Sequence, residues 1–318
     1  MLLKACVNPD PAIIEARIAL EALRKGIPPY PLKQSLGLPV FALPTIDFFS
    51  PNAFILQLES GEGQSHRMRF WQQQAAQQGF ATAYLILGQG AAPLLPKALN
   101  LLEAIVASTS LPNSSRGSHN ITQPEPANLL SRMLAWEAPY ADSEAEDLLS
   151  ILQHSPRITK GKQAFNPEMC HRILLVHQTH LKARNCQGLV LFLDGVEAEL
   201  ESLNKQSDLQ AAYTNLFRFI CPPQGYPKLI AALSPNLVHS FSFQNLIRLQ
   251  AAEHKPQIEE LKPQNHIELQ QLCLALSRLH HLAYQSSVPY VDLLNLVARC
   301  SSLRDQVKAI VQFLDDTV

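Results

Sequence analysis

The sequence carries little charge of either sign. Charged residues make up 17% of its 318 positions, and the formal net charge is −1, whereas about a quarter of the residues of typical soluble domains are charged. A nearly neutral chain has no overall electrostatic attraction to nucleic acid or to a membrane surface, although a local basic face stays open. The low charge also predicts limited solubility of the isolated chain, which favours membership of a complex.

Paired cysteines and long apolar runs are also missing. The six cysteines form no CxxC pair, and a chain of this length needs no disulfides to hold a core. We therefore expect reduced thiols in a cytoplasmic protein. Lys4 interrupts the apolar opening at once, so no signal peptide is expected. No run of about 18 apolar residues occurs, and no membrane association is expected.

Hydrophobic residues make up 47% of the chain, which is enough for one large domain or two smaller ones. Residues 53–58 (AFILQL) and 81–87 (ATAYLIL) are predicted strands, and a helix from about 66 to 78 lies between them. This order is a βαβ unit, which predicts a parallel sheet with helices on its faces. Two further apolar runs, 188–193 (GLVLFL) and 228–233 (KLIAAL), are predicted buried strands.

Helices are predicted on either side of this strand region. The first follows Pro11, with Ile14, Ile18 and Ala22 at helical spacing. Residues 107–127 are rich in Ser, Asn and Pro and are expected to form a loop. From about residue 246 onward the whole sequence is predicted to be helical. The other predicted helices cover 32–36, 129–136, 143–154, 166–184, 210–220, 243–252, 266–283, 288–300 and 303–316.

A glycine-rich segment, LESGEGQSH, starts at Leu58 between the first strand and its helix. A phosphate loop needs glycines for close backbone approach, a lysine for positive charge and a Ser or Thr hydroxyl for magnesium. Gly61, Gly63 and Ser65 stand at the required positions. Gln64 stands where the lysine should be, and Leu58 where the first glycine should be. The pattern fails at two places, so a plain turn without a ligand is the alternative.

The GLVLFL strand ends in an acidic residue, Asp194. Apolar residues followed by an aspartate form the Walker B pattern, in which Asp194 and Ser65 would hold a magnesium ion. An ATPase of this type has a glutamate next, which polarises the attacking water. Gly195 stands there instead, and Glu197 lies two residues further on. A buried strand that ends in a surface aspartate is the alternative.

Five segments follow one another along the chain: IALEALRKGIP (18–28), residues 54–87, GLVLFLDGVE (188–197), IELQQLCLALSRLHHLAY (267–284) and LRDQVKAIVQFLD (303–315). In this order they resemble the ATP-binding P-loop proteins of BREX-type phage-defence systems, which are relatives of AAA+ ATPases of the origin-recognition kind. The resemblance implies an α/β fold: a three-layer, AAA+-like P-loop NTPase with a parallel sheet and a helical C-terminal lid. It predicts an N-terminal helical segment at 1–45, the P-loop domain at 46–245 and the lid at 246–318.

The resemblance also assigns site residues, with ATP or ADP and magnesium as the cofactors. At the loop, Gln64 replaces the family's lysine and Glu62 replaces a small residue. Ser234 or Asn236 would fall near a sensor-1 position. Arg304 would fall near a sensor-2 position, or else be a solvated charge at a helix start. The implied nucleotide-binding set is Gly61, Glu62, Gly63, Gln64, Ser65, His66, Asp194, Asn236 and Arg304, with Ser65 and Asp194 at the magnesium ion.

The departures from the family pattern predict weak or absent catalysis. A hydrogen bond to a charged group is worth roughly 1.5–3 kcal/mol, so loss of the lysine weakens nucleotide binding about 10- to 100-fold. Glu59 and Glu62 add negative charge near the phosphates. Hydrolysis loses both its positioned cation and its oriented water. We expect a pseudo-ATPase that acts through protein subunits of a phage-defence or DNA-processing complex. The alternatives are a slow nucleotide-dependent switch and a DNA-contacting module.

Two other groups of residues have a functional and a purely structural interpretation. Residues 157–185 are locally basic, which suits contact with DNA or an acidic partner but also an ordinary solvated helix face. Cys170, His171, His177 and His180 lie on one predicted helix. Their spacing is poor for zinc, so we expect satisfied or exposed side chains there instead.

Overall fold

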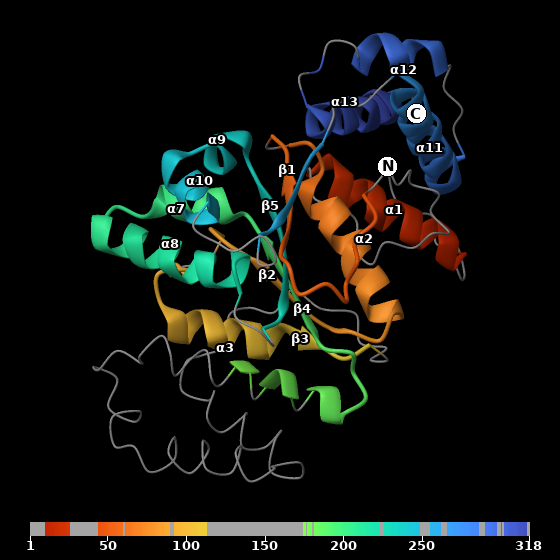
Figure 1. The fold of residues 1–318 in the computed structure, drawn as a ribbon. Helices are drawn as coiled ribbons and strands as arrows, with labels where there is room; N and C mark the ends of the chain where they lie inside the picture. The colour runs from red at the N-terminus through yellow and green to blue at the C-terminus, as the bar shows by residue number, and fades with distance from the viewer. Residues whose placement is uncertain are drawn as a thin grey trace. The chain divides into compact units, whose positions relative to one another are not determined.

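The computed structural model describes thirteen stretches of the chain, which form two compact units (Figure 1). The sheet unit comprises residues 46–57 and 71–260. The helical unit comprises 1–45, 58–70 and 261–318. The predicted helices at 32–36, 129–136 and 143–154 lie outside the described stretches. The residues that the structure describes are 10–25, 44–59, 61–89, 92–112, 174–175, 177–179, 181–222, 226–248, 255–261, 266–285, 290–297, 300 and 302–316.

The sheet has six strands in the order β3-β2-β4-β5-β1-β6. Every pairing is parallel except that of β2 with the short β3. The central strands β4 and β5 are buried along their whole length, which explains their unbroken apolar runs. The predicted α/β fold with a parallel sheet is confirmed. The strands are β1 (Phe54–Gln57), β2 (Ala81–Ile86), β3 (Thr109–Ser110), β4 (Leu189–Asp194), β5 (Lys228–Leu233) and β6 (Gln257–Glu260).

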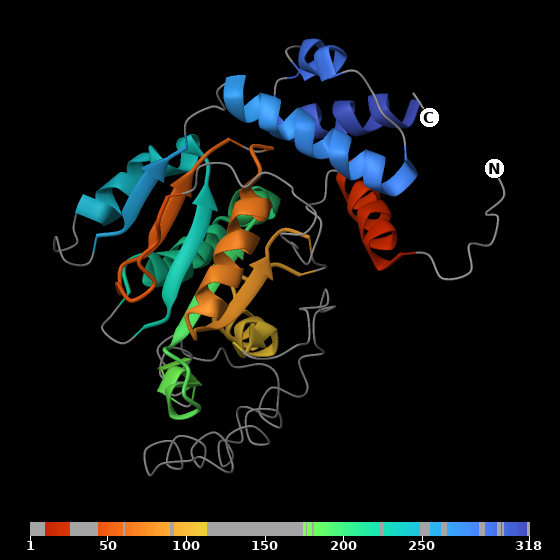
Figure 2. The ribbon, with the colours of Figure 1, turned by 90° about the vertical axis from the view of Figure 1, so that its right-hand side faces the viewer.

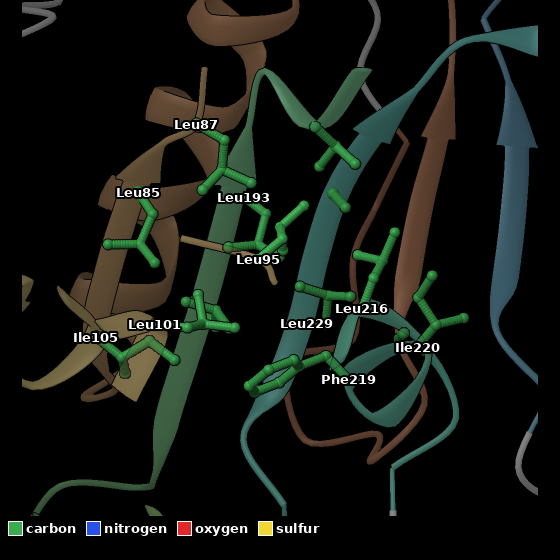
Figure 3. Close-up of a cluster of buried hydrophobic side chains, with 14 of the residues drawn as sticks. Leu85, Leu87, Leu95, Leu101, Ile105, Leu193, Leu216, Phe219, Ile220 and Leu229 are labelled. Carbon is green, nitrogen blue, oxygen red and sulfur yellow. The ribbon is translucent and has the colours of Figure 1, made fainter. Parts of the chain in front are cut away.

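Helices cover both faces of the sheet (Figure 2). The second half of α2 (Gln64–Gln77) lies on one face, where the ring of Trp71 is 5.4 Å from that of Phe54 and Gln72 donates a hydrogen bond to Thr82. On the other face, α3 (Ala98–Ser108) and α8 (Gln206–Ile220) bury their apolar sides against the strands. The side chains of that core shown in Figure 3 include Leu85, Leu101, Ile105, Leu193, Leu216, Phe219 and Leu229.

The connections from β1 and β5 run in opposite directions along the sheet. From β1 the chain passes through α2 to β2, beyond β5 and β4. From β5 it passes through α9 (Pro235–Val238) and α10 (Phe241–Arg248) to β6, on the far side of β1. Such a divergence is a topological switch point, and ligands of open α/β sheets bind outside the carboxyl ends of the strands there. The carboxyl edge at β1 and β5 is therefore the place to seek a site.

The expectation that everything after residue 246 is helical is wrong at β6. This segment, QIEE, pairs in parallel with β1 from Phe54↔Gln257 to Gln57↔Glu260. Its residues are half-buried or exposed, as suits an edge strand, so it lacks the apolar run by which buried strands are recognised. The expected loop at 107–127 is also wrong at its start, because α3 continues to Ser108 and β3 follows.

The helical unit combines helices from both ends of the chain. Helix α1 (Pro11–Arg24), capped by Asp10, shares a core with α11 (His266–Tyr284), α12 (Tyr290–Val297) and α13 (Leu303–Asp316). Arg24 donates two hydrogen bonds to Asp315, at 2.6 and 2.7 Å, and one to the Tyr284 hydroxyl at 3.0 Å. The domain boundaries at residues 45 and 245 stay predictions. The buried residues of this core are Ala16, Ala19, Leu20, Leu272, Cys273, Leu276, Leu279, Ala283, Leu293, Val297, Leu303, Ile310, Val311 and Leu314.

A buried lysine at the start of β5 makes stability depend on pH. Lys228 is 6% exposed, and its ammonium donates to the carbonyls of Ser50 and Asn52 at 3.2 and 2.9 Å. Burial lowers the pKa of Lys228 from 10.5 to about 8, against the opposing charge of Asp47. Between these pH values the unfolded chain binds a proton that the folded chain has lost, so the unfolding free energy should rise with pH, by roughly 2–3 kcal/mol.

Urea unfolding from pH 7.5 to 10.5 checks this expectation. In Lys228→Met the rise should be missing relative to the parent chain. Lys205→Met removes an exposed lysine instead and should follow the parent curve. The ionisation of thiols and tyrosines affects all three chains equally. It therefore cancels when the unfolding free energies of two chains are subtracted at the same pH. Parallel curves for the parent and Lys228→Met would contradict the assignment.

Candidate functional site

The loop that leaves the carboxyl end of β1 is shaped by two left-handed glycines. Gly61 has φ 96° and Gly63 has φ 80°, a region that other residues enter only with strain. A Cβ on Gly63 would lie 2.8 Å from the Arg67 guanidinium and 2.9 Å from a Leu303 methyl group. Helix α2 begins at Gln64, and its first N–H groups have no acceptor within the helix. The described part of the loop thus has two left-handed glycines directly before a helix start, and helix starts are places where anions can bind.

Arg67 supplies a cation inside this loop. Its side chain is 2% exposed, and its guanidinium donates a hydrogen bond to the backbone carbonyl of Glu62. Burial lowers the pKa of Arg67, while the carboxylates of Glu62 and Glu268 act in the opposite direction. The sequence could not show where this side chain points. In the structure it is directed back into the loop, close to Gly63.

Glu62 connects the loop to the start of α13. Its carboxylate accepts a hydrogen bond from the Leu303 N–H at 3.3 Å, and the Gly61 carbonyl accepts one from the Arg304 N–H at 3.0 Å. A carboxylate at a helix N-terminus is favourable because it meets the positive end of the helix dipole. The predicted sensor-2 residue, Arg304, thus lies beside the loop through its backbone, while its side chain is exposed. Glu59 is exposed as well.

The other predicted loop residues lie in the first turn of α2. Gln64 and Ser65 are half-buried. The Nε2 atom of His66 is buried without a hydrogen-bond partner among the described residues. Burial, together with the charge of Arg67, lowers the pKa of His66 to about 4, so its imidazole is neutral at physiological pH.

Asp194 ends β4 as a buried carboxylate. It is 5% exposed, and it accepts a hydrogen bond from the hydroxyl of Tyr84 on β2 at 2.8 Å. The Tyr84 ring stacks on that of Phe192, with centroids 6.1 Å apart. The alternative of a surface aspartate is therefore wrong. The carboxylate predicted to hold magnesium is already bonded to protein.

The residue after Asp194 is restricted to glycine by its backbone. Gly195 has φ 78°, and a Cβ there would lie 2.6 Å from the carbonyl oxygen of Leu87. Glu197 does not replace the missing glutamate, because its carboxylate accepts a hydrogen bond from the Ser234 N–H. Burial raises the pKa of Glu197. Glu197 thus joins the chain after β4 to the chain after β5.

The two residues predicted near sensor 1 have different surroundings. The Ser234 hydroxyl accepts a hydrogen bond from the Leu237 N–H at 3.3 Å and caps α9. Asn236, also in α9, is exposed. At the end of β1, the side-chain amide of Gln57 lies 3.2 Å from Nε2 of His239. Gln57, Asp194, Glu197 and Ser234 therefore all have protein partners at this edge of the sheet.

The structure brings the predicted residues together in two sets. In the helical unit, Gly61, Glu62 and Gly63 meet the start of α13 at Arg304. In the sheet unit, Asp194 and Ser234 lie at the same edge, since β4 and β5 are neighbours. β5 alone separates β4 from β1, which puts their ends two strand spacings, or about 10 Å, apart.

Tyr84 is a partner of Asp194 that was not predicted from the sequence. Its signal is the strand register, in which Asp194 pairs with Ile86 across β2 and β4. A side chain two residues from the directly paired position lies on the same face, within reach of a long aromatic side chain. The parallel register therefore indicates a tyrosine hydroxyl close to the Asp194 carboxylate.

Most of the basic segment 157–185 and the side chains of Cys170, His171 and His180 lie outside the described residues. His177 is buried, and its Nε2 lies 3.3 Å from the Thr109 hydroxyl. Among the residues that the structure describes, no group of three His, Cys, Asp or Glu is placed to hold a metal ion. No described helix has the length and apolar character of a membrane span.

Compared with protein-family models, with curated protein sequences and with solved structures, the chain matches none of them.

Proposed function

We propose that this chain is a degenerate P-loop protein with an AAA+-like fold, in which ATP binding is weak or lost and ATP hydrolysis is weak or absent. It acts through protein partners in a phage-defence or DNA-processing complex. Three features support the fold: a switch point at β1 and β5, two left-handed glycines before a helix, and helices after the sheet. The nearly neutral charge of the chain supports action within a complex.

The observation that carries the loss of catalysis is the pair Asp194 and Gly195. Phosphoryl transfer needs positioned positive charge, a metal ion and an oriented water. To bind magnesium, Asp194 would have to share or release the hydroxyl of Tyr84. The next position, where a water-polarising glutamate would stand, accepts only glycine without strain. A water-polarising glutamate is therefore missing from the sequence, and the backbone conformation at position 195 also disfavours one.

The residues fit a nucleotide only in part. Gly61, Gly63 and the first turn of α2 offer N–H groups to phosphates. Ser65 belongs to the helical unit and Asp194 to the sheet unit, and the expectation that both hold a magnesium ion stays a prediction from the sequence. A bound magnesium ion would neutralise phosphate charge. Arg67 is the buried cation of the loop, but it is bonded to the Glu62 carbonyl.

A turnover assay beside calorimetry tests the proposal. With ATP and magnesium, the purified chain should release phosphate no faster than buffer, and Asp194→Ala should give the same rate. Calorimetry should give a dissociation constant about 10- to 100-fold above that of an intact loop, or no heat at all. Robust turnover that Asp194→Ala abolishes would overturn the proposal.

The retained glycine geometry favours one second candidate, a switch that binds nucleotide without rapid hydrolysis. Its mark would be thermal stabilisation by millimolar ATP or ADP. Gly63→Asp would remove that stabilisation, but it also places a side chain against Arg67 and Leu303. Ser65→Ala is the milder variant, because it removes only a hydroxyl from the first turn. Absence of any shift at millimolar nucleotide would exclude this candidate.

A further inference from the structure

We propose that Glu62 and Arg67 form an internal latch that closes the loop at residues 61–67 onto the first turn of α13 and excludes polyphosphate while it is closed. The inference rests on the proposed function for its ligand class, a polyphosphate, and concerns the regulation of that same loop. All of its residues belong to the helical unit.

The first half of the latch is the contact between the loop and α13. The Glu62 carboxylate accepts from the Leu303 N–H, and the Gly61 carbonyl accepts from the Arg304 N–H. Both amides lie in the first turn of α13, where no acceptor exists within the helix. A Cβ on Gly61 would lie 3.2 Å from the Ser302 side chain, so the two segments are in close contact.

The second half is the placement of the loop's cation. The Arg67 guanidinium donates to the carbonyl of Glu62, the residue whose carboxylate meets α13. It lies in the electrostatic field of Glu268 on α11 as well. Its charge is therefore directed to groups of the chain itself. A phosphate in the loop would have to draw Arg67 away from these partners.

The two halves exclude an anion by competition. The Glu62 carboxylate and a phosphate carry charge of the same sign, so each disfavours the other beside Arg67 and the amides of the loop. When the Glu62 carboxylate releases the Leu303 N–H, it can move away from the anion-binding part of the loop. The Arg67 guanidinium can then turn toward a bound phosphate. Release of the latch should therefore strengthen polyphosphate binding.

The far end of α13 is held separately. Asp315 accepts hydrogen bonds from Arg24 and lies 3.1 Å from Nε2 of His280, which is buried on α11. Opening at Leu303 thus leaves the helix attached through its last turn. Leu303 also belongs to the buried core of the helical unit, so the latch opens by movement of the loop and the Glu62 side chain away from α13, without unfolding of that unit.

Hydrogen exchange of the nucleotide-free full chain, resolved at single amides, tests the latch itself. In Glu62→Ala the amides of Leu303 and Arg304 should exchange at least about tenfold faster than in the parent. Asp305 supplies an internal reference, because its amide is capped by the Ser302 hydroxyl at 3.2 Å. Glu59→Ala, which removes an exposed carboxylate from the same loop, should leave all three amides unchanged. Parent-like exchange in Glu62→Ala overturns the latch.

Titration with inorganic tripolyphosphate tests the exclusion. Glu62→Ala should bind it about tenfold more tightly than the parent, and Arg67→Met in the same background should remove that gain. Glu62→Met, which keeps the length of the side chain but has no acceptor oxygen, replaces Glu62→Ala if the alanine variant fails to fold. Unchanged affinity with accelerated exchange overturns the exclusion. ATP turnover by the parent chain would overturn the proposed function and leave the exchange result standing, so the two failures are distinguishable.

Discussion

Replacement of Glu199 by alanine is expected to lower the free energy of unfolding by about 3–5 kcal/mol. Glu199 lies in α7 (Val196–Ser202) and is 1% exposed. Its carboxylate accepts three backbone hydrogen bonds: from Gly88 at 3.2 Å, Leu94 at 2.8 Å and Leu95 at 2.5 Å. Alanine would leave one buried and two part-buried N–H groups without an acceptor, and an unsatisfied buried group costs about 1–3 kcal/mol.

Urea unfolding monitored by circular dichroism measures this loss. Glu201→Ala is the matched control, because it removes an exposed carboxylate from the same helix and should change stability by less than about 0.5 kcal/mol. Glu199→Gln keeps one acceptor oxygen and should fall between the two. Equal midpoints for Glu199→Ala and Glu201→Ala would show that the three hydrogen bonds do not hold the segment at 88–95.

Gly195→Glu, the substitution that restores the family's glutamate on paper, should destabilise the fold and create no ATPase. A left-handed conformation costs a residue with a side chain roughly 1–2 kcal/mol. The Cβ would also lie 2.6 Å from the Leu87 carbonyl oxygen, and such overpacking costs about 1–3 kcal/mol. The expected loss is therefore about 2–5 kcal/mol.

Gly195→Ala and Gly79→Ala separate the cost of backbone strain from the cost of the steric clash with Leu87. Gly79 also has a left-handed backbone, with φ 85°, but a Cβ there would meet only the Gln187 side chain at 3.4 Å. Gly79→Ala should therefore show the strain alone, and Gly195→Ala should lose about 1–3 kcal/mol more. Unfolding midpoints measure the difference. A Gly195→Glu chain that is as stable as the parent and hydrolyses ATP would contradict both the geometry and the proposed function.

The sheet could be predicted from the sequence because its central strands are buried on both faces. Their apolar runs end at Asp194 and Leu233, close to where the strands end. β6 could not be recognised in this way. It is an edge strand whose position is fixed by pairing with β1, and pairing of this kind leaves no periodic pattern in four residues.

The residues of the candidate site could be predicted from the sequence, but the hydrogen bonds that their side chains form could not. The glycines at 61 and 63 have the backbone expected of them. The sequence could not show that Glu62 caps another helix or that Arg67 turns back into its own loop. The contact of Glu62 with Leu303 joins positions 241 apart in the chain, and local patterns carry no information at that distance. Whether nucleotide binds stays a prediction.

The pairing of α1 with the last helix has a consequence for synthesis on the ribosome. Arg24 and Asp315, which bond directly, are separated by 291 positions. Helix α1 therefore emerges long before the surfaces that bury Ala16, Ala19 and Leu20 exist. Contacts of such long range close late and slow the completion of folding. During translation the apolar residues of this segment therefore have no partner in the fold, and transiently exposed apolar surface of this kind promotes aggregation.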